Sequence, residues 1–323
     1  MSDYDVVLIG EILVEFYCEG PPVDQARLRL GFSGDVLNAA AAASAAGART
    51  AILTAVAEDQ LGDALVERVR ALGVDTALIR RVPAGNGAYL LHGDLSGERE
   101  FTYWRTASAA SGLGVADIER ERAVLAGTRA LVASGVGSAL SDNCRDAIAA
   151  AARIAAEAGA AVVYDPNFRA RLTTAERARA ALAELAPHCA LITPSCPSDA
   201  RALLGTEDPL TAARAVLALG ARAAAVTSGA DQVVVMGAGA GAGAGAGEPL
   251  TLPVPTVANA VDATGAGDVL TGTTAARLAL GDPLPTAVSL AIGAASLSVT
   301  GRGGTGRIPT LTESRAVAPA VRA

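Results

Sequence analysis

The sequence contains no lysine, because all 26 of its basic residues are arginines. This absence excludes every protein class that depends on an ε-amine: P-loop nucleotide-binding proteins, protein kinases with a strand lysine, pyridoxal-phosphate enzymes and Schiff-base aldolases. Arginine cannot take over these roles, since its guanidinium group stays protonated and differs from an ammonium group in shape. Four large enzyme classes are therefore excluded by composition alone.

Metal-binding and disulfide patterns are also missing. The four cysteines show no CxxC spacing and both histidines stand apart from them: Cys18, Cys144, Cys189, Cys196, His92 and His188. We therefore expect neither a zinc site nor a disulfide framework. No run of 18 apolar residues suggests a transmembrane helix, and the start MSDYDVVLIGE lacks a charged region followed by an apolar one. We interpret the chain as a soluble, cytoplasmic protein.

Positive charge is in deficit. The chain of 323 residues carries 33 acidic and 26 basic side chains, for a net charge of -7. Binding to nucleic acid or to anionic membranes draws on clustered positive charge, so neither partner is expected. With 51% hydrophobic and 18% charged residues the sequence is typical of a globular protein, and its length allows one large α/β domain or two small ones.

Short apolar runs alternate with alanine-rich helical stretches along most of the chain. Strands are expected at 4–10, 50–56, 129–133, 161–165, 189–192 and 222–227, with the first helices at 35–46 and 60–72. This alternation is typical of a mainly parallel sheet covered by helices on both faces. The first strand ends at Glu11, and open α/β sheets bind ligands at that edge.

Two segments, about 11–32 and 87–105, interrupt the alternation with short β-like runs. The second reads as a hairpin, and seven of the ten aromatic residues fall in the two segments. They predict either a small sheet that needs bulky residues for packing or a β lid over a polar ligand or a second subunit. Residues 237–247 alternate Gly and Ala without interruption and predict a flexible hairpin tip.

The most informative stretch is NAVDATGAGDVLTG, residues 259–272. Its small-residue turn at 264–267 precedes a helical run that starts at Asp268. Backbone N–H groups at a helix N-terminus bind anions. A carboxylate beside such a site is what phosphoryl transfer to a hydroxyl requires, because it supplies a base for the alcohol proton. We expect Asp268 to be ionised at neutral pH, since the helix start favours the charged form. An ordinary N-cap would explain Asp268 but not the adjoining turn.

A second turn of small residues, 31–38, precedes the first long helix. It follows the first lid segment, so Gly34, Asp35 and Asn38 are placed to hydrogen-bond a polyol. Taken alone this turn is weak evidence, since Gly and Asp often begin helices.

With both turns, the sequence resembles the ribokinase-like or PfkB family of carbohydrate kinases over nearly its whole length. The run DATGAGD at 262–268 is similar to the family's DTTGAGD element. The resemblance implies a single ribokinase-like three-layer α/β/α domain over 1–323 with a small β lid. It also implies that Asp268 is the catalytic base, that Gly265, Ala266 and Gly267 form the anion hole, and that ATP with Mg²⁺ is the phosphoryl donor.

Within that family the residues are most similar to those of kinases acting on 2-keto-3-deoxygluconate. Such a keto acid carries a carboxylate that ribose and fructose lack, and Arg105 beside Tyr103 offers a forked cation with a phenolic donor. Arg105 as a solvated lid residue is the alternative. The resemblance implies a sugar-acid site formed by Glu11, Gly34, Asp35, Asn38, Tyr89, Tyr103, Arg105, Asp165, Asn167 and Arg169.

The sequence departs from the family pattern in several places, and Ser33-Gly34 replaces the usual Gly-Gly pair of the first turn. Asp35 stands near the position of the lysine in the ribokinase-type GGKG element. Where the family often has Asn-x-x-Glu near the magnesium, this chain has Ser195-Cys196-Pro197-Ser198 followed by Asp199. The nucleotide turn at Thr227, Ser228 and Gly229 lacks its last glycine. Asp262 and Thr264 resemble positions that hold a monovalent cation, K⁺, in some relatives.

Other functions remain open at this stage. A fructokinase or another ketose or sugar-acid kinase is the nearest enzyme alternative, and a non-catalytic sugar- or nucleotide-binding regulator is the alternative from another class. A nicotinamide dehydrogenase is disfavoured because no GxGxxG follows the first strand. The exposed edges of a small β lid also predict a homo-oligomer paired through it.

Overall fold

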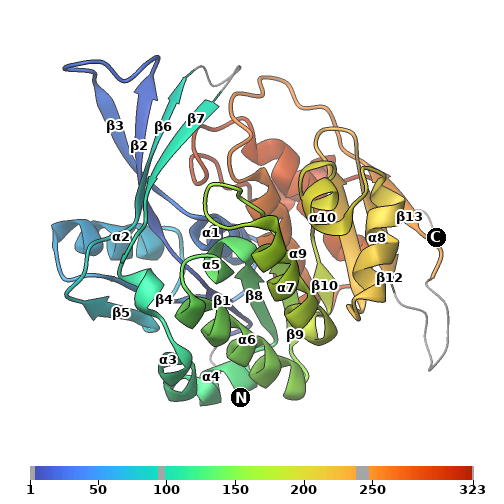
Figure 1. Ribbon diagram of the computed structural model, residues 1–323. Coiled ribbons are helices and arrows are strands. Elements are labelled where there is room, and N and C mark those ends of the chain that lie inside the picture. Colours follow the sequence, from blue (N-terminus) through green and yellow to red (C-terminus); the bar gives the residue numbers. More distant parts are fainter. Residues whose placement is uncertain (1–3, 94–98, 238–246, 322–323) are drawn as a thin grey trace.

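The computed structural model describes residues 4–93, 99–237 and 247–321 and shows a large twisted sheet with helices on both faces (Figure 1). The order of its nine strands is β13-β12-β11-β10-β9-β8-β1-β4-β5. The strands are β1 (Val6–Ile9), β4 (Thr50–Ala57), β5 (Ile79–Val82), β8 (Ala130–Ser134), β9 (Ala161–Asp165), β10 (Leu191–Ile192), β11 (Ala223–Ser228), β12 (Gln232–Gly237) and β13 (Leu250–Pro253). The seven neighbours β11-β10-β9-β8-β1-β4-β5 pair in parallel. At one edge, β12 pairs antiparallel with β11 and with β13. The predicted three-layer α/β/α class is confirmed.

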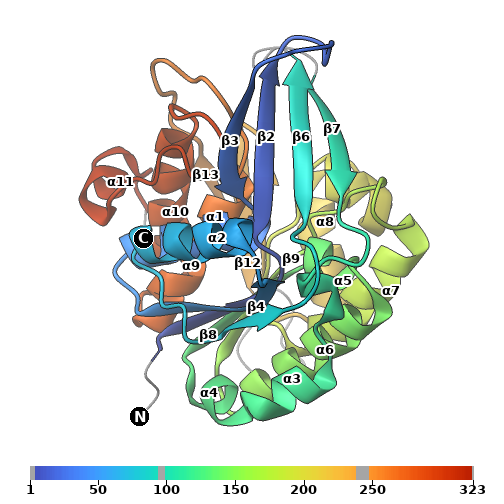
Figure 2. The same ribbon diagram turned by 90° about the vertical axis from the view of Figure 1, so that its left-hand side faces the viewer.

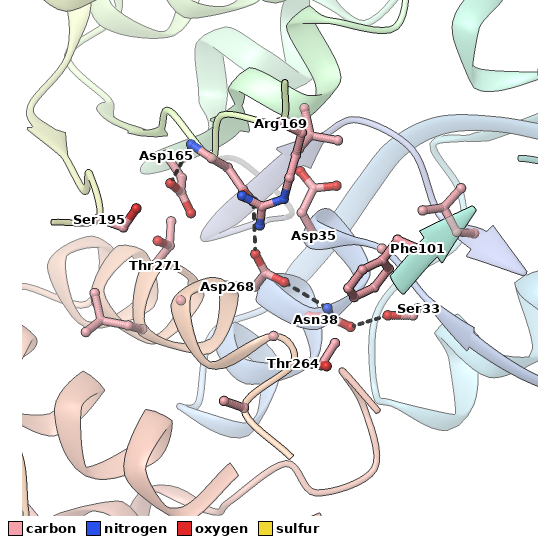
Figure 3. A pocket seen from close by; sticks show the side chains of 18 of the residues that line it. Ser33, Asp35, Asn38, Phe101, Asp165, Arg169, Ser195, Thr264, Asp268 and Thr271 are labelled. Carbon is pink, nitrogen blue, oxygen red and sulfur yellow. Dashed lines mark hydrogen bonds between the residues drawn. The ribbon is translucent and has the colours of Figure 1, made fainter. Parts of the chain in front are cut away.

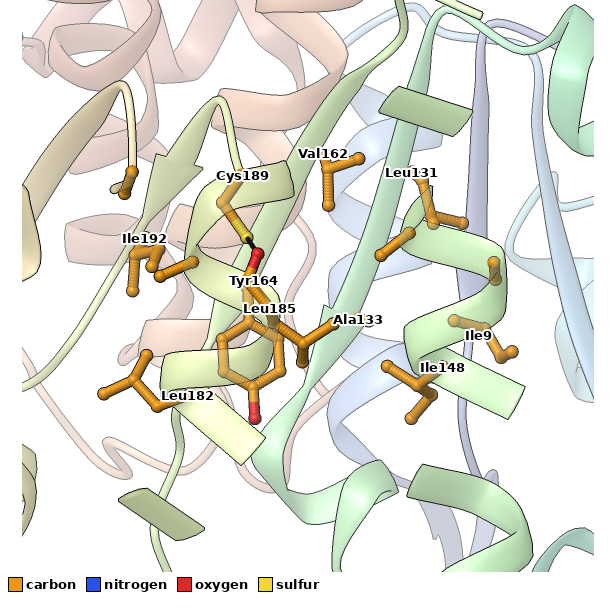
Figure 4. Packing of buried hydrophobic residues seen from close by; sticks show 14 of the residues in the cluster. Ile9, Leu131, Ala133, Ile148, Val162, Tyr164, Leu182, Leu185, Cys189 and Ile192 are labelled. Atoms are coloured by element: carbon orange, nitrogen blue, oxygen red, sulfur yellow. Dashed lines mark hydrogen bonds between the residues drawn. The ribbon is translucent and has the colours of Figure 1, made fainter. Parts of the chain in front are cut away.

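Side chains of each central strand alternate between two apolar cores. In β1, Val7 and Ile9 pack in the first core and Val6 and Leu8 in the second. Such double burial explains why this strand reads as an unbroken apolar run. Helices on the first side are α3 (Val115–Arg120), α4 (Arg122–Gly127), α6 (Asp142–Glu157), α7 (Ala175–Leu185) and α8 (Pro209–Ala218). Figure 4 shows this core around the fully buried ring of Tyr164.

Helices α1 (Asp35–Ala45), α2 (Gln60–Ala71), α9 (Ala266–Ala279) and α10 (Leu284–Ser298) contribute to the second core. Helix α9 lies against α1 so closely that a Cβ atom on Gly272 would come within 2.0 Å of the Ala39 carbonyl oxygen. Small residues are therefore needed at this contact. The contact brings the start of α1 beside the start of α9, although more than 200 residues separate them.

A second, four-stranded sheet stands away from the central one (Figure 2). Its order is β3-β2-β6-β7, with β2 (Leu13–Glu19), β3 (Leu28–Ser33), β6 (Ala88–Gly93) and β7 (Arg99–Trp104). The two lid segments expected at about 11–32 and 87–105 thus form one sheet, joined by parallel pairing of β2 and β6. We call it the small sheet.

The remaining described helical segments are short: η1 (Ala110–Gly112), α5 (Gly135–Ser138), η2 (Ala186–His188), η3 (Ala200–Leu204) and α11 (Leu311–Val317). No helix in the described part of the chain is long and apolar enough to cross a membrane. Of the Gly-Ala tip predicted at 237–247, residues 238–246 lie outside the described residues, between the paired strands β12 and β13.

Candidate active site between the two sheets

A polar cavity of about 500 Å³ opens between the small sheet and the carboxyl ends of the central strands (Figure 3). Residues from both sheets, from α1 and from the start of α9 line it, as open α/β sheets lead one to expect. Of the predicted site residues it contains Gly34, Asp35, Asn38, Tyr89, Tyr103, Arg105, Asp165, Asn167, Arg169, Thr227, Thr264, Gly265, Gly267 and Asp268.

The turn before α9 supplies the floor of this cavity. Gly265 caps the helix in the left-handed conformation, with φ of 80°, and the helix begins at Ala266, two residues earlier than predicted. A Cβ atom on Gly267 would meet no heavy atom within 4 Å, so the space above this residue is open. The Ala266 N–H donates to the Ala263 carbonyl at 3.3 Å, and free N–H groups of a first helical turn can bind an anion. Anion binding at this turn stays a prediction.

Asp268 lies in this first turn and is held by two amides. Asn38 Nδ2 donates to Asp268 Oδ2 at 2.8 Å, and Asn167 Nδ2 donates to Asp268 Oδ1 at 3.3 Å. Asn167 has a positive φ of 38°, so a strained turn delivers its side chain. Each carboxylate oxygen thus has a fixed donor and the group has a defined orientation.

The pKa of Asp268 is raised to about 7, chiefly because burial disfavours the charged form and because the Asp35 carboxylate lies nearby. The hydrogen bond from Asn38, the positive charge of Arg169 and the hydrogen bond from Asn167 oppose this shift. The expectation that the helix start keeps Asp268 ionised at neutral pH does not hold for all of the molecules, because the pKa is raised to about 7. Burial and a like charge outweigh the helix start, and Asp268 titrates near neutral pH.

Two further carboxylates make the cavity acidic. Asp35 accepts a hydrogen bond from the Ser134 hydroxyl through Oδ2, while its buried Oδ1 has no hydrogen-bond partner among the described residues. Asp165, at the end of β9, accepts from the Asn167 backbone N–H at 3.0 Å. Burial, followed by the charges of Asp199 and Asp268, holds the pKa of Asp165 well above its usual range. A polar or cationic ligand would satisfy these groups.

Arg105 lies on the wall of the cavity and is fixed from behind by Glu11. Glu11 is 1% exposed and does not line the cavity, although it was predicted to bind the sugar. Its carboxylate accepts from Arg105 Nε at 2.5 Å and from the Ser108 hydroxyl. Arg105 Nη2 is buried without a partner in the described part of the chain, so the guanidinium retains unused donor capacity.

Arg169 is a second cation at this cavity, and its surroundings differ. Its side chain is exposed, donates to the Phe168 carbonyl at 3.0 Å, and forms no ion pair with any described residue. Its charge lowers the pKa of both Asp165 and Asp268. The cavity thus contains one arginine compensated by a buried carboxylate and one that faces solvent.

Three rings of the small sheet form the roof. The ring centroids of Tyr89 and Phe101 are 5.7 Å apart, those of Tyr89 and Tyr103 6.2 Å, and those of Phe101 and Tyr103 6.0 Å. The Tyr89 hydroxyl donates to Glu15, and burial raises the pKa of both groups. Glu15 was missed by sequence reasoning, because only the pairing of β2 with β6 places it opposite Tyr89.

Asp262 holds the turn in place. Its Oδ1 accepts from the Thr264 backbone N–H at 2.9 Å and from the Thr264 hydroxyl at 2.7 Å, and its Oδ2 accepts from Gly303 N–H at 2.8 Å. The carboxylate therefore joins the loop at 301–306 to the turn before α9. Whether it also holds a monovalent cation stays a prediction.

A second, apolar cavity of about 450 Å³ lies next to the polar one. The two share Thr227, Ala263, Gly267 and Leu270 on their walls. Of the predicted nucleotide residues, Thr227 and Gly229 line this cavity, while Ser228 lies outside it with a buried, unpartnered hydroxyl in the described structure. Sequence reasoning missed its apolar wall, formed by Val233, Val254, Val257, Ile292, Ala295 and Val299.

The segment that replaces Asn-x-x-Glu also reaches the polar cavity. Asp199 is 2% exposed and accepts from Phe168 N–H, Ser195 N–H and the Ser195 hydroxyl at 2.7 to 2.8 Å. Across the described ranges, no three His, Cys, Asp or Glu side chains are grouped so that they could hold a metal ion. A metal here would need further oxygen ligands from a substrate.

Comparison with known proteins gives a consistent result. A family model described as pfkB family carbohydrate kinase matches residues 3–311. Over 315 residues, 96% of this chain and 92% of the relative, the sequence is 28% identical to a 2-dehydro-3-deoxygluconokinase of Thermoproteus tenax. It is also 28% identical to a 2-dehydro-3-deoxygalactonokinase of Haloferax volcanii, covering 93% of this chain and 92% of that protein.

Among solved structures, a putative ribokinase II of Escherichia coli in complex with ATP and Mg²⁺ superimposes with a TM-score of 0.85. The two sequences are 25% identical, and the match covers 98% of this chain and 99% of the other. The predicted fold and the resemblance drawn from the two glycine turns are thereby confirmed.

Proposed function

The chain belongs to the pfkB family of carbohydrate kinases, and from this premise we propose that it transfers the γ-phosphoryl group of ATP to 2-keto-3-deoxygluconate. The acceptor is the terminal C6 hydroxyl of the sugar acid. Its relatives include kinases named for 2-dehydro-3-deoxygluconate and for 2-dehydro-3-deoxygalactonate, two forms of the same chemical class. Both names denote a six-carbon keto acid.

One observation carries the proposal: a polar and an apolar cavity meet over the first turn of α9. A nucleotide base fits the apolar cavity, whose walls are mainly valine, alanine and isoleucine side chains. A polyol fits the polar one. The phosphates would then cross Gly267, which borders both cavities and leaves the space above it free.

Two arginines of the polar cavity offer a place for a substrate carboxylate, apart from the carboxylates of Asp35, Asp165, Asp199 and Asp268. Arg105 and Arg169 both line the cavity, and each guanidinium matches a carboxylate in geometry and charge. The Tyr89 hydroxyl donates a hydrogen bond to Glu15 and also has a side-chain hydrogen bond with Ser33, so Tyr89 presents its ring to the cavity from a fixed position. Asp35, with an unpartnered buried oxygen, is an acceptor for a hydroxyl.

Asp268 acts as the general base in this proposal. Its carboxylate takes the proton of the C6 hydroxyl as the bond from that oxygen to the γ-phosphorus forms and the bond from the γ-phosphorus to the β-phosphate oxygen breaks, which releases ADP. Backbone N–H groups at Gly265, Ala266 and Gly267 stabilise the charge on the transferred group. A pKa of about 7 suits this task, because the base is partly free at neutral pH and still accepts a proton readily.

Mg²⁺ would be held near Thr193, Ser195 and Asp199, which line the polar cavity, and Asp199 would have to exchange one of its three hydrogen bonds for the ion. Mg²⁺ prefers oxygen ligands and commonly takes one or two from protein and the rest from phosphates and water. The lack of a complete acidic cluster among the described residues agrees with that mode of binding. When bound, the ion neutralises charge on the phosphates. We further propose that Asp262 and Thr264 hold a monovalent cation, K⁺.

We also propose that the small sheet is the lid of a single kinase domain and pairs with the lid of a second copy. Its inner rings face the cavity, while Leu28, Leu30 and Trp104 on the outer side are 50%, 55% and 54% exposed. A sheet with free edges and an apolar outer side is a liability unless it is covered. Scattering or ultracentrifugation at micromolar concentration should show a dimer, and a monomer would remove the pairing.

An assay of ADP release tests the main proposal. The acceptors are 2-keto-3-deoxygluconate, 2-keto-3-deoxygalactonate, gluconate, fructose and ribose, each with ATP and Mg²⁺. We expect kcat/KM for a keto acid to exceed that for either neutral sugar at least about tenfold, the effect of one charge-assisted contact. A preference for fructose or ribose would contradict the keto-acid assignment, and no turnover on any acceptor would favour a binding protein.

A further inference from the structure

Asn38 lies in an enclosed position at the start of α1. It was expected to bind the sugar, yet its side chain is 2% exposed. A Cβ atom on Gly265 would lie 3.0 Å from Asn38 Nδ2, and a Cβ atom on Gly304 would lie 2.3 Å from the same atom. Two neighbouring glycines therefore make room for this amide, because a Cβ atom on either would crowd it.

The hydrogen bonds of the amide set its orientation. Asn38 Nδ2 donates to Asp268 Oδ2 at 2.8 Å, and Ser33 Oγ donates to Asn38 Oδ1 at 3.4 Å (Figure 3). A carboxylate oxygen only accepts, so the NH₂ end of the amide must face Asp268. The bond to Asp268 therefore takes one of the two N–H donors of the amide, and that donor is not available to a ligand.

We propose that Asn38 is a positioning residue that holds the carboxylate of Asp268 toward the acceptor hydroxyl, rather than a residue that recognises the sugar. This inference rests on the proposed role of Asp268 as the base. Displacing a reacting group by about 1 Å lowers the rate on the order of 100-fold. A buried donor that fixes the Asp268 carboxylate therefore raises the rate of the reaction.

The small sheet takes part in this arrangement. Ser33 ends β3, and the Thr305 hydroxyl donates to the carbonyl of Phe32 in the same strand at 3.1 Å. Asn38 thus lies between the base and the last residues of a lid strand. A shift of the end of β3 would move the Ser33 hydroxyl, which bonds to the same Asn38 amide that orients Asp268.

Asn38 also affects the protonation of the base. Its hydrogen bond lowers the pKa of Asp268, because a donor stabilises the charged carboxylate. The other titratable or charged groups that face this cavity are Asp35 from α1, Asp165 at the end of β9, Arg169 from a loop, Asp199 just before η3, Tyr89 and Tyr103 from the small sheet, and Arg105 just after β7. Asp35 raises the pKa of Asp268 and Arg169 lowers it. Without the Asn38 donor, less opposes the effect of Asp35, and the pKa of Asp268 should be higher.

Asn38→Asp tests the inference with almost no change of shape. The variant loses the donor and adds a like charge beside Asp268, so the pKa of the base should rise. We expect kcat at pH 7 to fall about 10- to 100-fold with KM for the sugar acid within about threefold. The acid limb of kcat/KM should move upward by at least about one pH unit, so that part of the lost activity returns at pH 9.

Two controls keep the result interpretable. Asn143→Asp makes the same chemical change on an exposed residue of α6 and should leave kcat, KM and the pH profile as in the wild type. If Asn38→Asp does not fold, as judged by circular dichroism and thermal melting, Asn38→Ala takes its place. Asn38→Ala removes the donor without adding charge, and it should show the same fall in kcat with a smaller shift of the pH profile.

The outcomes separate this inference from the proposed function. A KM for the sugar raised more than about tenfold, with kcat and pH profile unchanged, would make Asn38 a sugar-binding residue and overturn the inference. Wild-type kinetics in both Asn38 variants would overturn it equally. If Asp268→Asn itself keeps wild-type turnover, the proposed base is wrong and the proposed function fails with it.

Discussion

The two cavities on either side of the α9 start are built in different ways. The polar cavity takes side chains from both sheets and gathers four carboxylates and two arginines, and most of them have named hydrogen-bond partners. The apolar cavity is lined largely by aliphatic side chains of β12, α10 and the segment 254–260. Charge and orientation matter in the first, whereas shape and excluded water matter in the second.

This difference predicts how each cavity responds to substitution. Removing a polar partner leaves a buried group unsatisfied and changes chemistry or specificity sharply. Changing an aliphatic wall alters volume, and its effect is confined to the ligand that fills the space. Variants of the polar cavity should therefore act on kcat and on the choice of acceptor, and variants of the apolar cavity on the nucleotide alone.

The largest effect is expected for Asp268→Asn. The variant keeps an oxygen that accepts from Asn38 but cannot take a proton, so kcat should fall at least about 10²- to 10⁴-fold. Affinity for ATP, measured by calorimetry, should stay within a few fold, since the apolar cavity is intact. A variant that keeps more than about a tenth of the wild-type kcat would move the chemistry away from this residue.

Arg105→Ala should change the choice of acceptor. Loss of a charge-assisted contact worth about 1.5 to 3 kcal/mol raises KM for a keto acid roughly 10- to 150-fold and for a neutral sugar far less. The double variant Glu11→Gln/Arg105→Ala leaves no buried charge unpaired and should show the same loss of preference. Equal losses on both acceptors would assign Arg105 to the fold, and an effect confined to Arg169→Ala would move carboxylate recognition to that residue.

Ala295→Phe should act on the nucleotide. Ala295 lies on the wall of the apolar cavity, and a phenyl ring there occupies space that a base would need. Overfilling typically costs about 1 to 3 kcal/mol, so KM for ATP should rise roughly 5- to 150-fold with KM for the sugar within about twofold. Ala183→Phe, on an exposed position of α7, is the matched control. A change in the sugar KM alone would exchange the roles of the two cavities.

The pH dependence should show the smallest effect. The folded-state pKa of Asp268, about 7, lies above its unfolded value near 3.9, so the folded protein binds this proton more tightly. Wild-type stability should therefore decline relative to Asp268→Asn as pH rises from 4 to 7 and then level off. Melting temperatures should differ by at least about 2 °C at pH 8 and converge at pH 4. A constant difference across this range would contradict the raised pKa.

Most of the central architecture could be predicted, because parallel strands buried on both faces read as short apolar runs between helical stretches. The predicted strands at 50–56 and 161–165 differ from β4 and β9 by one residue or less at either end. The turn before α9 could also be predicted, since small residues followed by an acidic residue at a helix start are typical of an anion-binding turn. These strands and this turn could be predicted because local sequence patterns determine them.

Contacts between distant segments could not be predicted. Glu11 follows the first strand and was placed at the ligand, but its carboxylate lies behind Arg105, 94 residues later in the chain. Glu15 meets Tyr89 only because β2 and β6 pair in parallel. The apolar cavity has no motif at all, since valine and alanine are common everywhere in this sequence. Such sites depend on tertiary packing, which a sequence pattern does not specify.

The most direct test of the two-cavity arrangement is a crystal structure of Asp268→Asn with ATP, Mg²⁺ and 2-keto-3-deoxygluconate. This variant should bind all three and turn over too slowly to consume them. We predict the base between Val254 and Ile292, the γ-phosphate over Gly267 and the C6 hydroxyl within hydrogen-bond distance of residue 268. A base in the polar cavity, or a sugar acid bound away from residue 268, would contradict the account.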